Sequence, residues 1–350
     1  MYKPFLTNAH ALLSASDVTV TFVDVGSRNG IIELASISKF VDAYGFEPNP
    51  VEYEKLVHGT TDASKFGIHS PKYRSLTYSP CALADTAGRR PFYITRGPGA
   101  AGMLEPNYER LKEIHWKGYT YTPNIAEEIF TVERITEIET DTLQHWAQQQ
   151  HLGSIDYLKI DVEGSAYEVF QGVGKELLKH TGIIKVEVEF IPFRKGQKLF
   201  SEVDIFLRQY GFDLLRYEII PVQIGFKERT THWNFGPEIG IPERYGQPLQ
   251  CDAIYVNRCI EDPNRALAQA VVLLEKNYID EALHIFRTRA GVTDEQFLNA
   301  LRDFPGTFRQ RFLRQIFSLF LFWNTLHALP EKIRLWKGWH ELKRCCGLKR

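Results

Sequence analysis

Three ionisable side chains alternate along one short apolar segment near the middle of the chain. In SIDYLKIDVEG, residues 154–164, single residues separate Lys159, Asp161 and Glu163. Successive side chains of a β-strand point to opposite faces, so a strand that stops at Gly164 would place all three on one face. Burying two acids and a lysine without partners is costly. The pattern therefore indicates either a catalytic site at a strand end or a buried ion pair that only orders that end.

The next apolar segment repeats this alternation. In KVEVEF, residues 185–190, Glu187 and Glu189 share one face of a predicted strand, which could also simply face solvent. If the two strands are neighbours, these carboxylates converge with Asp161 and Glu163 over one crevice. Clustered carboxylates can bind sugar hydroxyls, raise one another's pKa or hold a divalent cation. The sequence leaves these three possibilities open.

A glycine-containing turn follows the first apolar segment. In TFVDVGSRNG the apolar residues end at Asp24 and lead into Gly26 and Gly30. Gly26 permits a positive φ or the close approach of a ligand, and Gly30 would let a following helix pack tightly against the strand. The turn is therefore a candidate for binding a ligand through its main chain.

An acid follows about 20 residues after this turn, the spacing at which a carboxylate accepts the hydroxyls of an adenosine ribose. It is Glu47, in YGFEPNP, and its alternative role is to cap the helix that follows. A dinucleotide fingerprint needs Gly-x-Gly-x-x-Gly, and Arg28 occupies the place of its second glycine. This favours S-adenosylmethionine over a nicotinamide cofactor, with a dehydrogenase as the weaker alternative.

Four segments together resemble the FkbM family of S-adenosylmethionine-dependent methyltransferases in order and spacing. They are FVDVGSRNG, YGFEPNP, SIDYLKIDVEGSAYEVFQG and VEVEFIPFRKGQKLFSEVDIFLRQYGFDLL, and the resemblance covers about residues 20–257. The family's glycine loop commonly reads Asp-Val-Gly-Ala-Asn-x-Gly, so Ser27 and Arg28 stand here in place of Ala and Asn. The resemblance implies a class I methyltransferase-like Rossmann sheet of seven strands, the last antiparallel, with S-adenosylmethionine as cofactor.

The resemblance also implies the residues that hold the cofactor. Asp85, in CALADTAG, would lie beside the adenine, or else belongs to a solvated turn. The full set expected to bind the cofactor is Asp24, Gly26, Ser27, Asn29, Gly30, Glu47 and Asp85.

Methyl transfer to a hydroxyl needs alignment of donor and acceptor and removal of a proton. Asp161 is the first choice of base and Glu163 the second, with Lys159 orienting them. Glu187, Glu189 and His115 are expected to contact the substrate, and His115 is also an alternative base. Family resemblance favours a hydroxyl of a sugar, a glycan or a polyketide-like metabolite, and an amine or a carboxyl group is the alternative acceptor. The competing function is a non-catalytic, methyltransferase-like module that assembles through its helical tail, and Arg28 is the feature that favours it.

The elements that must position these residues alternate along the chain. Apolar runs at 21–25, 41–46, 154–162, 182–190 and 211–220 predict strands, and apolar spacings of three and four at 30–40, 50–59, 165–180 and 199–210 predict helices. Such alternation predicts an α/β fold with a parallel sheet, and residues 250–257 predict a last strand. The aperiodic segments 97–128 and 221–250 predict lids or binding loops.

The 350 residues suit a methyltransferase domain over 1–258 and a helical extension over 259–350, in which residues 266–291 resemble one helical hairpin that caps the main domain. A net charge of -1 argues against nucleic acid as a partner. The first residues match a secretion signal poorly, five cysteines fit neither a disulfide framework nor a zinc site, and no apolar run is long enough to span a bilayer. We expect a cytoplasmic protein.

The last segment, residues 308–350, has its own character. Its ten basic and two acidic residues give it a charge of +8 and leave -9 for the rest of the chain. It contains the apolar run IFSLFLFW and sets Trp336 and Trp339 among cations. These features suit peripheral docking on the anionic inner face of a membrane, a homodimer or partner interface, or packing on the main domain.

Overall fold

A computed structural model describes residues 6–116, 125–219, 223–226 and 248–293, and the following account concerns these residues. The chain divides into two units after residue 293, and the described residues all belong to the first unit. The basic segment 308–350 lies outside the described residues.

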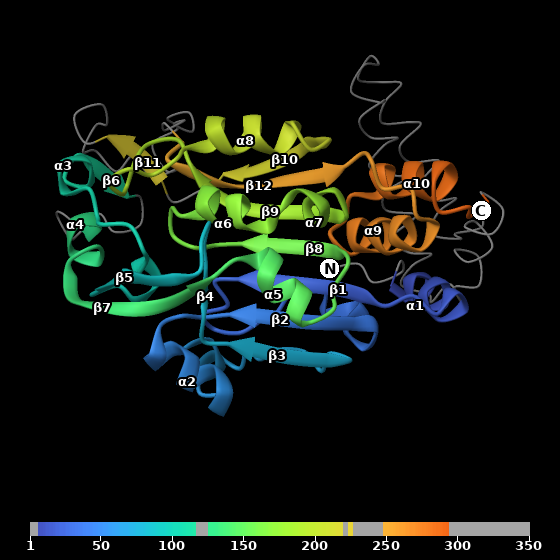
Figure 1. The fold of residues 1–350 in the computed structure, drawn as a ribbon, viewed down its shortest axis with the longest axis horizontal. Helices are drawn as coiled ribbons and strands as arrows, with labels where there is room; N and C mark the ends of the chain where they lie inside the picture. Colours follow the sequence, from blue (N-terminus) through green and yellow to red (C-terminus); the bar gives the residue numbers. More distant parts are fainter. Residues whose placement is uncertain (1–5, 117–124, 220–222, 227–247, 294–350) are drawn as a thin grey trace, which may run out of the picture. The chain divides into compact units, whose positions relative to one another are not determined.

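The first unit is built on a seven-stranded sheet in the order β10-β12-β9-β8-β1-β2-β3 (Figure 1). Its strands are β1 (Val20–Val25), β2 (Val41–Phe46), β3 (Ser75–Ser79), β8 (Ile155–Ile160), β9 (Thr181–Glu189), β10 (Phe212–Ile219) and β12 (Gln250–Asn257). The pairs β1–β2, β2–β3, β1–β8 and β8–β9 are parallel, whereas β12 is antiparallel to both β9 and β10. This confirms the α/β fold with a reversed last strand.

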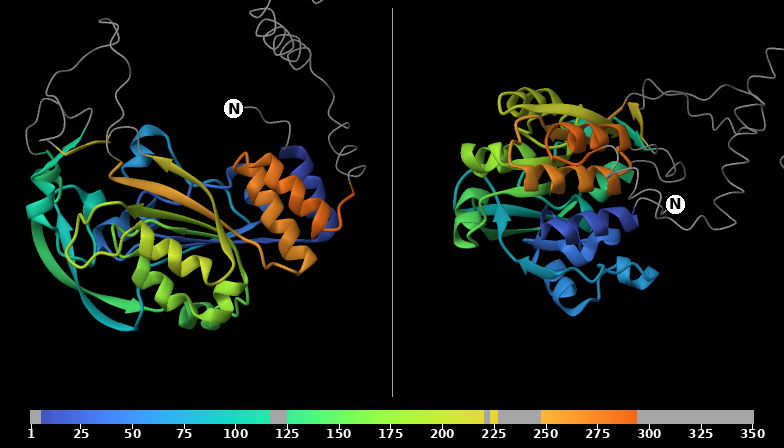
Figure 2. Two further views of the ribbon diagram at one scale, coloured as in Figure 1. Left: turned by 90° about the horizontal axis from the view of Figure 1, so that it is seen from above. Right: turned by 90° about the vertical axis from the view of Figure 1, so that its right-hand side faces the viewer.

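Helices cover both faces of the sheet. The helices α5 (Leu143–Gln149), α6 (Ala166–Val173), α7 (Lys175–Lys179) and α8 (Phe200–Arg208) share one core with one face, and α2 (Pro50–His58) packs beside β3. On the other face, α9 (Pro263–Glu275) contacts β8 and β9, and α1 (Leu6–Ser16) and α10 (Ile279–Thr288) pack against α9 (Figure 2). Among the described helices, none is long and apolar enough to cross a membrane.

The segment 30–40 differs from its prediction as a helix that packs on the sheet. Turns lead through Leu34, at φ 54°, into a 3₁₀ helix, η1 (Ala35–Phe40). The segment buries Ile31, Leu34 and Ile37 at spacings of three, but only Ile37 lies within η1. The sequence prediction counted this spacing as α-helical and was wrong here.

The helix α9 packs on the sheet face beside this short segment. Arg265 pairs at 2.7 Å with buried Asp156 of β8, and fully buried Gln269 donates to the carbonyls of Gly182 (2.8 Å) and Asn257 (3.0 Å). At its end Lys276 pairs with Glu33. The domain division after residue 258 stays a prediction, and α9 and α10 lie in the compact unit that contains the sheet.

Smaller sheets lie beside the carboxyl ends of the central strands. One joins β4 (Ala82–Leu83), β7 (Val132–Asp141) and β5 (Gly88–Thr95), and another pairs β6 (Ile114–Trp116) with β11 (Gln223–Phe226). The segment 97–128, predicted to be irregular, contains η3 (Pro98–Ala100), α3 (Tyr108–Leu111), β6 and the start of α4 (Ile125–Ile129). A further short 3₁₀ helix, η2 (Ala63–Phe66), follows α2. These additions border one edge of the sheet, where the site lies.

Candidate active site

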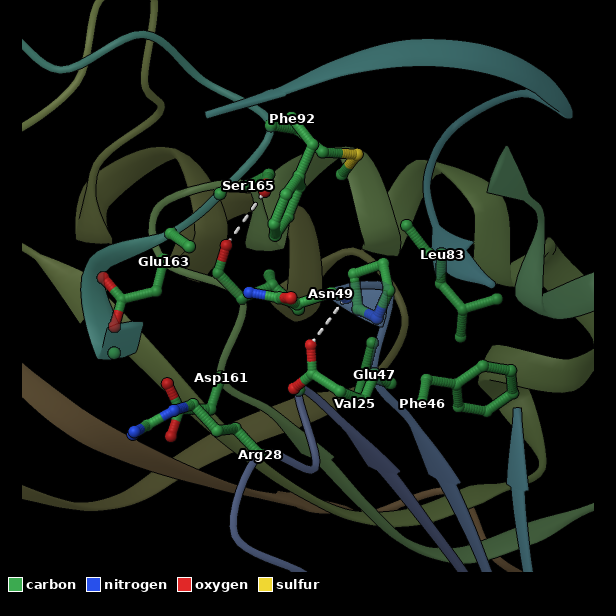
Figure 3. A pocket seen from close by; sticks show the side chains of 18 of the residues that line it. Val25, Arg28, Phe46, Glu47, Asn49, Leu83, Phe92, Asp161, Glu163 and Ser165 are labelled. Carbon is green, nitrogen blue, oxygen red and sulfur yellow. Dashed lines mark hydrogen bonds between the residues drawn. The ribbon is translucent and has the colours of Figure 1, made fainter. Parts of the chain in front are cut away.

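The carboxyl ends of β1, β2 and β8 border a cavity of about 240 Å³ (Figure 3). Six residues expected at the site line it: Gly26, Asn29, Glu47, Lys159, Asp161 and Glu163. The segment 98–103 and residues of β4 and β5 contribute further lining. The cavity thus joins the glycine turn to the acid-rich end of β8.

Close contacts with neighbouring main chain fix the conformation of the glycine turn. Gly26 has φ +93°, and a Cβ there would lie 1.8 Å from the carbonyl oxygen of Asp161. The Oγ of buried Ser27 donates to the carbonyl of Asp24 (2.7 Å) and accepts from the amide of Phe46 (3.0 Å). Only glycine lets the chain after β1 lie so close to the chain after β8. Gly30 (φ +92°) also has the left-handed backbone, but no α-helix follows it.

Glu47 lies between the cavity and the residue that begins α2. Its side chain is 5% exposed and lines the cavity, while Oε1 accepts from the amide of Asn49 (2.8 Å), the residue that caps α2. Burial raises the pKa of Glu47 to about 7. Phe46, Leu83 and Phe92 line the cavity with apolar surface (Figure 3).

Asp24 supports the site from beneath the cavity and is not among its lining residues. Its Oδ1 lies 3.1 Å from Lys159 Nζ, which is in turn 3.7 Å from an oxygen of Asp161. Burial raises the pKa of Asp24 to about 6 although Lys159 opposes the rise. Asp24 therefore fixes the lysine that faces Asp161.

Three carboxylates converge as the alternation suggested. Asp161, Glu163 and Glu187 each offer an oxygen, and these oxygens lie within 4.8 Å of one another. β8 ends at Ile160, before the acids, and Glu163 has φ 54°, so a turn rather than the strand predicted through 162 brings them together. Burial and the neighbouring acids raise the pKa of Glu187 well above its ordinary value, while Gln250 donates to its Oε1 (2.8 Å). Glu187 therefore favours its protonated form.

Sequence reasoning missed Arg194, which lies in IPFRKGQ between β9 and α8. Its side chain is 0% exposed, and Nη2 donates to Glu163 (2.5 Å) and to the carbonyl of Ala100 (3.0 Å). Its Nη1 lies 3.9 Å from Glu189, whose pKa burial raises to about 7 against the effect of Arg194, and its Cζ lies 4.9 Å from the ring of Phe130. The sequence feature that could have identified it is a single arginine soon after a strand end rich in acids, which is a natural partner for their charge.

Ser27, Gly30, Glu187 and Glu189 were also expected at the site and, like Asp24, are not among the residues that line the cavity. Asp85 pairs with Arg90 and is not among the lining residues, although Ala82 and Leu83 of the same segment are. His115 pairs through β6 with Gly225 of β11, and its side chain is outside the described part of the structure.

Comparisons with known proteins point to one family. The model of the methyltransferase FkbM domain matches residues 24–214, more than half of the chain. "Methyltransferase sdnD" of Sordaria araneosa is 25% identical over 208 residues, which cover 55% of this chain and 74% of that protein.

Two solved structures are similar at low identity. Magnesium protoporphyrin IX methyltransferase (ChlM) from Synechocystis PCC 6803, with bound SAH, matches at a TM-score of 0.29 and 8% identity over 73% of this chain and 83% of that chain. The methyltransferase domain of bacterial CtHen1-C matches at a TM-score of 0.30 and 11% identity over 73% of this chain and 97% of that chain.

Proposed function

Because the chain belongs to the FkbM family of S-adenosylmethionine-dependent methyltransferases, we propose that it methylates a hydroxyl oxygen of a sugar, a glycan or a related metabolite. The observation that supports a hydroxyl acceptor is that Asp161 and Glu163 line the same cavity as Gly26 and Glu47. Acids able to take a proton thus adjoin the edge of the sheet at which the cofactor is expected. The cofactor supplies an electrophilic methyl group on a sulfonium.

The lining residues suit this cofactor. The buried carboxylate of Glu47, at the end of β2, can accept the two ribose hydroxyls. The apolar side chains of Phe46, Leu83 and Phe92 offer a surface for the adenine. The class I methyltransferase-like sheet brings these groups together at one edge.

The acids have different partners, which suggests different roles. Asp161, 40% exposed and 3.7 Å from Lys159, is the proposed base that removes the hydroxyl proton. Glu163 is bound by Arg194 and is the second choice, while protonated Glu187 can donate to the acceptor. A positioned base contributes about 10²–10⁴-fold and alignment about 7–11 kcal/mol when geometry is ideal.

Binding and transfer are measured separately to test this proposal. Calorimetry of the full chain with S-adenosylmethionine and S-adenosylhomocysteine tests the cofactor, and no binding at millimolar ligand would overturn the proposal. Transfer of a radiolabelled methyl group to cell-envelope extracts tests the reaction. We expect the wild type to transfer the label. Asp161→Asn should transfer it about 100-fold more slowly and keep its affinity for S-adenosylhomocysteine. Binding without transfer to any extract would favour the non-catalytic module.

The nature of the labelled bond tests the acceptor. A methyl ether on a hydroxyl survives mild alkali, whereas a methyl ester does not. Release of the label as methanol in mild alkali would therefore show that the acceptor is a carboxyl group and not a hydroxyl. Recovery of the label in a methylated amine after acid hydrolysis would show that the acceptor is a nitrogen atom.

We propose two alternative ways in which the repulsion among the three carboxylates is relieved. Either a divalent cation binds them, or they share a proton. Their oxygens are close enough for one cation to touch more than one of them. If a cation binds there, Mg²⁺ or Mn²⁺ will raise the melting temperature of the wild type relative to EDTA and leave that of Glu187→Gln unchanged. Equal melting temperatures in both conditions would favour the shared proton.

A further inference from the structure

Arg28 is the clearest departure of this chain from the glycine loop of its family, and it lines the cavity. Its Nε donates to Glu52 of α2 (3.1 Å), and its Nη2 donates to Asp62 (3.0 Å). Within the part of the chain that the structure describes, Nη1 has no hydrogen-bond partner. Nη1 lies 3.6 Å from the position that a Cβ of Gly99 would occupy, so it faces the segment that forms another wall of the cavity.

The ion-pair network around Arg28 carries surplus positive charge. Lys55 also pairs with Glu52 (2.7 Å), and Lys65 also pairs with Asp62 (2.7 Å). Within the described residues of this network, three cations thus face two acids. Of the three cations only Arg28 lines the cavity. Arg28 is therefore the member of this network that can contact a ligand in the cavity.

The field of Arg28 reaches both ends of the cavity. It opposes the rise in pKa that burial causes at Glu47, and it does the same at Glu163. The side chain is 25% exposed, so part of its charge is shielded from water.

We propose that Arg28 binds the α-carboxylate at the methionine end of S-adenosylmethionine. This inference rests on the proposed function, because it needs that cofactor. Of the described residues that line the cavity, the cations are Arg28 and Lys159, and Lys159 is held by Asp24 at 3.1 Å and faces Asp161. The lining acids would repel a carboxylate, whereas a guanidinium binds one through charge-assisted hydrogen bonds.

Two ligands separate the carboxylate from the rest of the cofactor. S-adenosylhomocysteine carries the carboxylate, and 5′-methylthioadenosine keeps the thioadenosine without it. In calorimetry with the full chain, we expect Arg28→Met to weaken S-adenosylhomocysteine by about 10- to 100-fold and to change 5′-methylthioadenosine by less than about twofold. Lys55→Met is the matched control, because it removes the other cation on Glu52 without touching the cavity, and it should leave both affinities unchanged.

Each other outcome has a distinct meaning. Equal weakening of both ligands in Arg28→Met would show that Arg28 only holds the loop, and unchanged S-adenosylhomocysteine affinity would show that it does not bind the carboxylate; either result overturns the inference and leaves the proposed function intact. A wild type that binds neither ligand would overturn the proposed function itself. If Arg28→Met melts early, Arg28→Asn, which restores the residue common in the family, provides the same comparison.

Discussion

The carboxyl groups of the site differ mainly in the side chain that faces each of them. Asp24 faces Lys159, Glu163 faces Arg194, and Glu187 receives an amide hydrogen bond from Gln250. Environments that push carboxyl groups apart in pKa are how one site obtains both a proton acceptor and a proton donor. The roles proposed for these acids therefore follow from their partners.

Glu47 should make cofactor binding depend on pH. Burial raises its pKa to about 7, so without ligand its stabilising effect is greatest below its ordinary pKa and is lost as the pH rises through about 7. Ribose hydroxyls donate to the charged form, so affinity for S-adenosylhomocysteine should fall by up to about tenfold per pH unit below pH 7. Calorimetry across this range checks the slope, and Glu47→Gln should bind about 10- to 100-fold more weakly with a flatter profile. A wild-type profile that parallels that of Glu47→Gln would contradict this role.

Arg194 should be coupled energetically to Glu163. Arg194→Met leaves a largely buried carboxylate without its cation and should lower the free energy of unfolding by about 3–5 kcal/mol. Adding Glu163→Gln should recover part of this loss, because the uncompensated charge is then gone. Urea denaturation of the two single variants and the double variant measures the coupling. Strictly additive losses would show that Arg194 acts through packing on Phe130 instead.

At the level of elements, the sequence predicted strands well and three of the four helical segments, the exception being 30–40. β2 and β12 occupy the predicted residues, because β-branched and aromatic runs bounded by turn residues are strong local signals. The segment 30–40 was predicted as a helix because residue spacing alone does not report the positive φ of Leu34 or the tertiary packing of α9. The apolar cavity wall at Phe92 comes from an added strand with no recognisable motif.

The helical pair α9–α10 should be required for folding, although it follows the last strand in the chain. Large aliphatic side chains of α9, such as Leu267, Val271 and Leu273, are buried, and each contributes about 1.5–3 kcal/mol. Together they are comparable with a typical total stability of about 5–15 kcal/mol. A chain of residues 1–260 should therefore fail to give a cooperative melt, whereas residues 1–293 should melt cooperatively and bind S-adenosylhomocysteine. Binding by residues 1–260 at wild-type affinity would show that the pair is dispensable.

On the scale of the whole molecule, opposite charges are separated along the chain. Residues 308–350 carry +8 and the remainder -9, although the total is only -1. A sequence that combines an excess of positive charge with tryptophans suits an anionic bilayer. We propose that this segment brings the enzyme to the inner face of a membrane, where a lipid-linked glycan would be accessible.

Membrane docking can be tested with vesicles. The full chain should co-sediment with vesicles that contain about one third phosphatidylserine, and raising the salt concentration should weaken this binding because the attraction is electrostatic. A chain that stops at Gly306 should remain in the supernatant. Equal binding to neutral vesicles would contradict electrostatic docking, and a change from dimer to monomer on truncation would instead identify an interface between copies of the chain.

The position of α9 in the chain has a consequence for biosynthesis. Phe22 and Tyr157 stack at 4.8 Å on the sheet face that α9 adjoins, yet the helix begins only at Pro263. At about 5–20 residues per second, a ribosome needs roughly 10–50 s to proceed from the first of these rings to the helix. The apolar side chains of this face are therefore made before the helix that covers them, and they stay exposed until α9 has been synthesised. The newly made protein should therefore depend on chaperones until translation ends. Co-expression of chaperones should raise the yield of folded protein in a heterologous host.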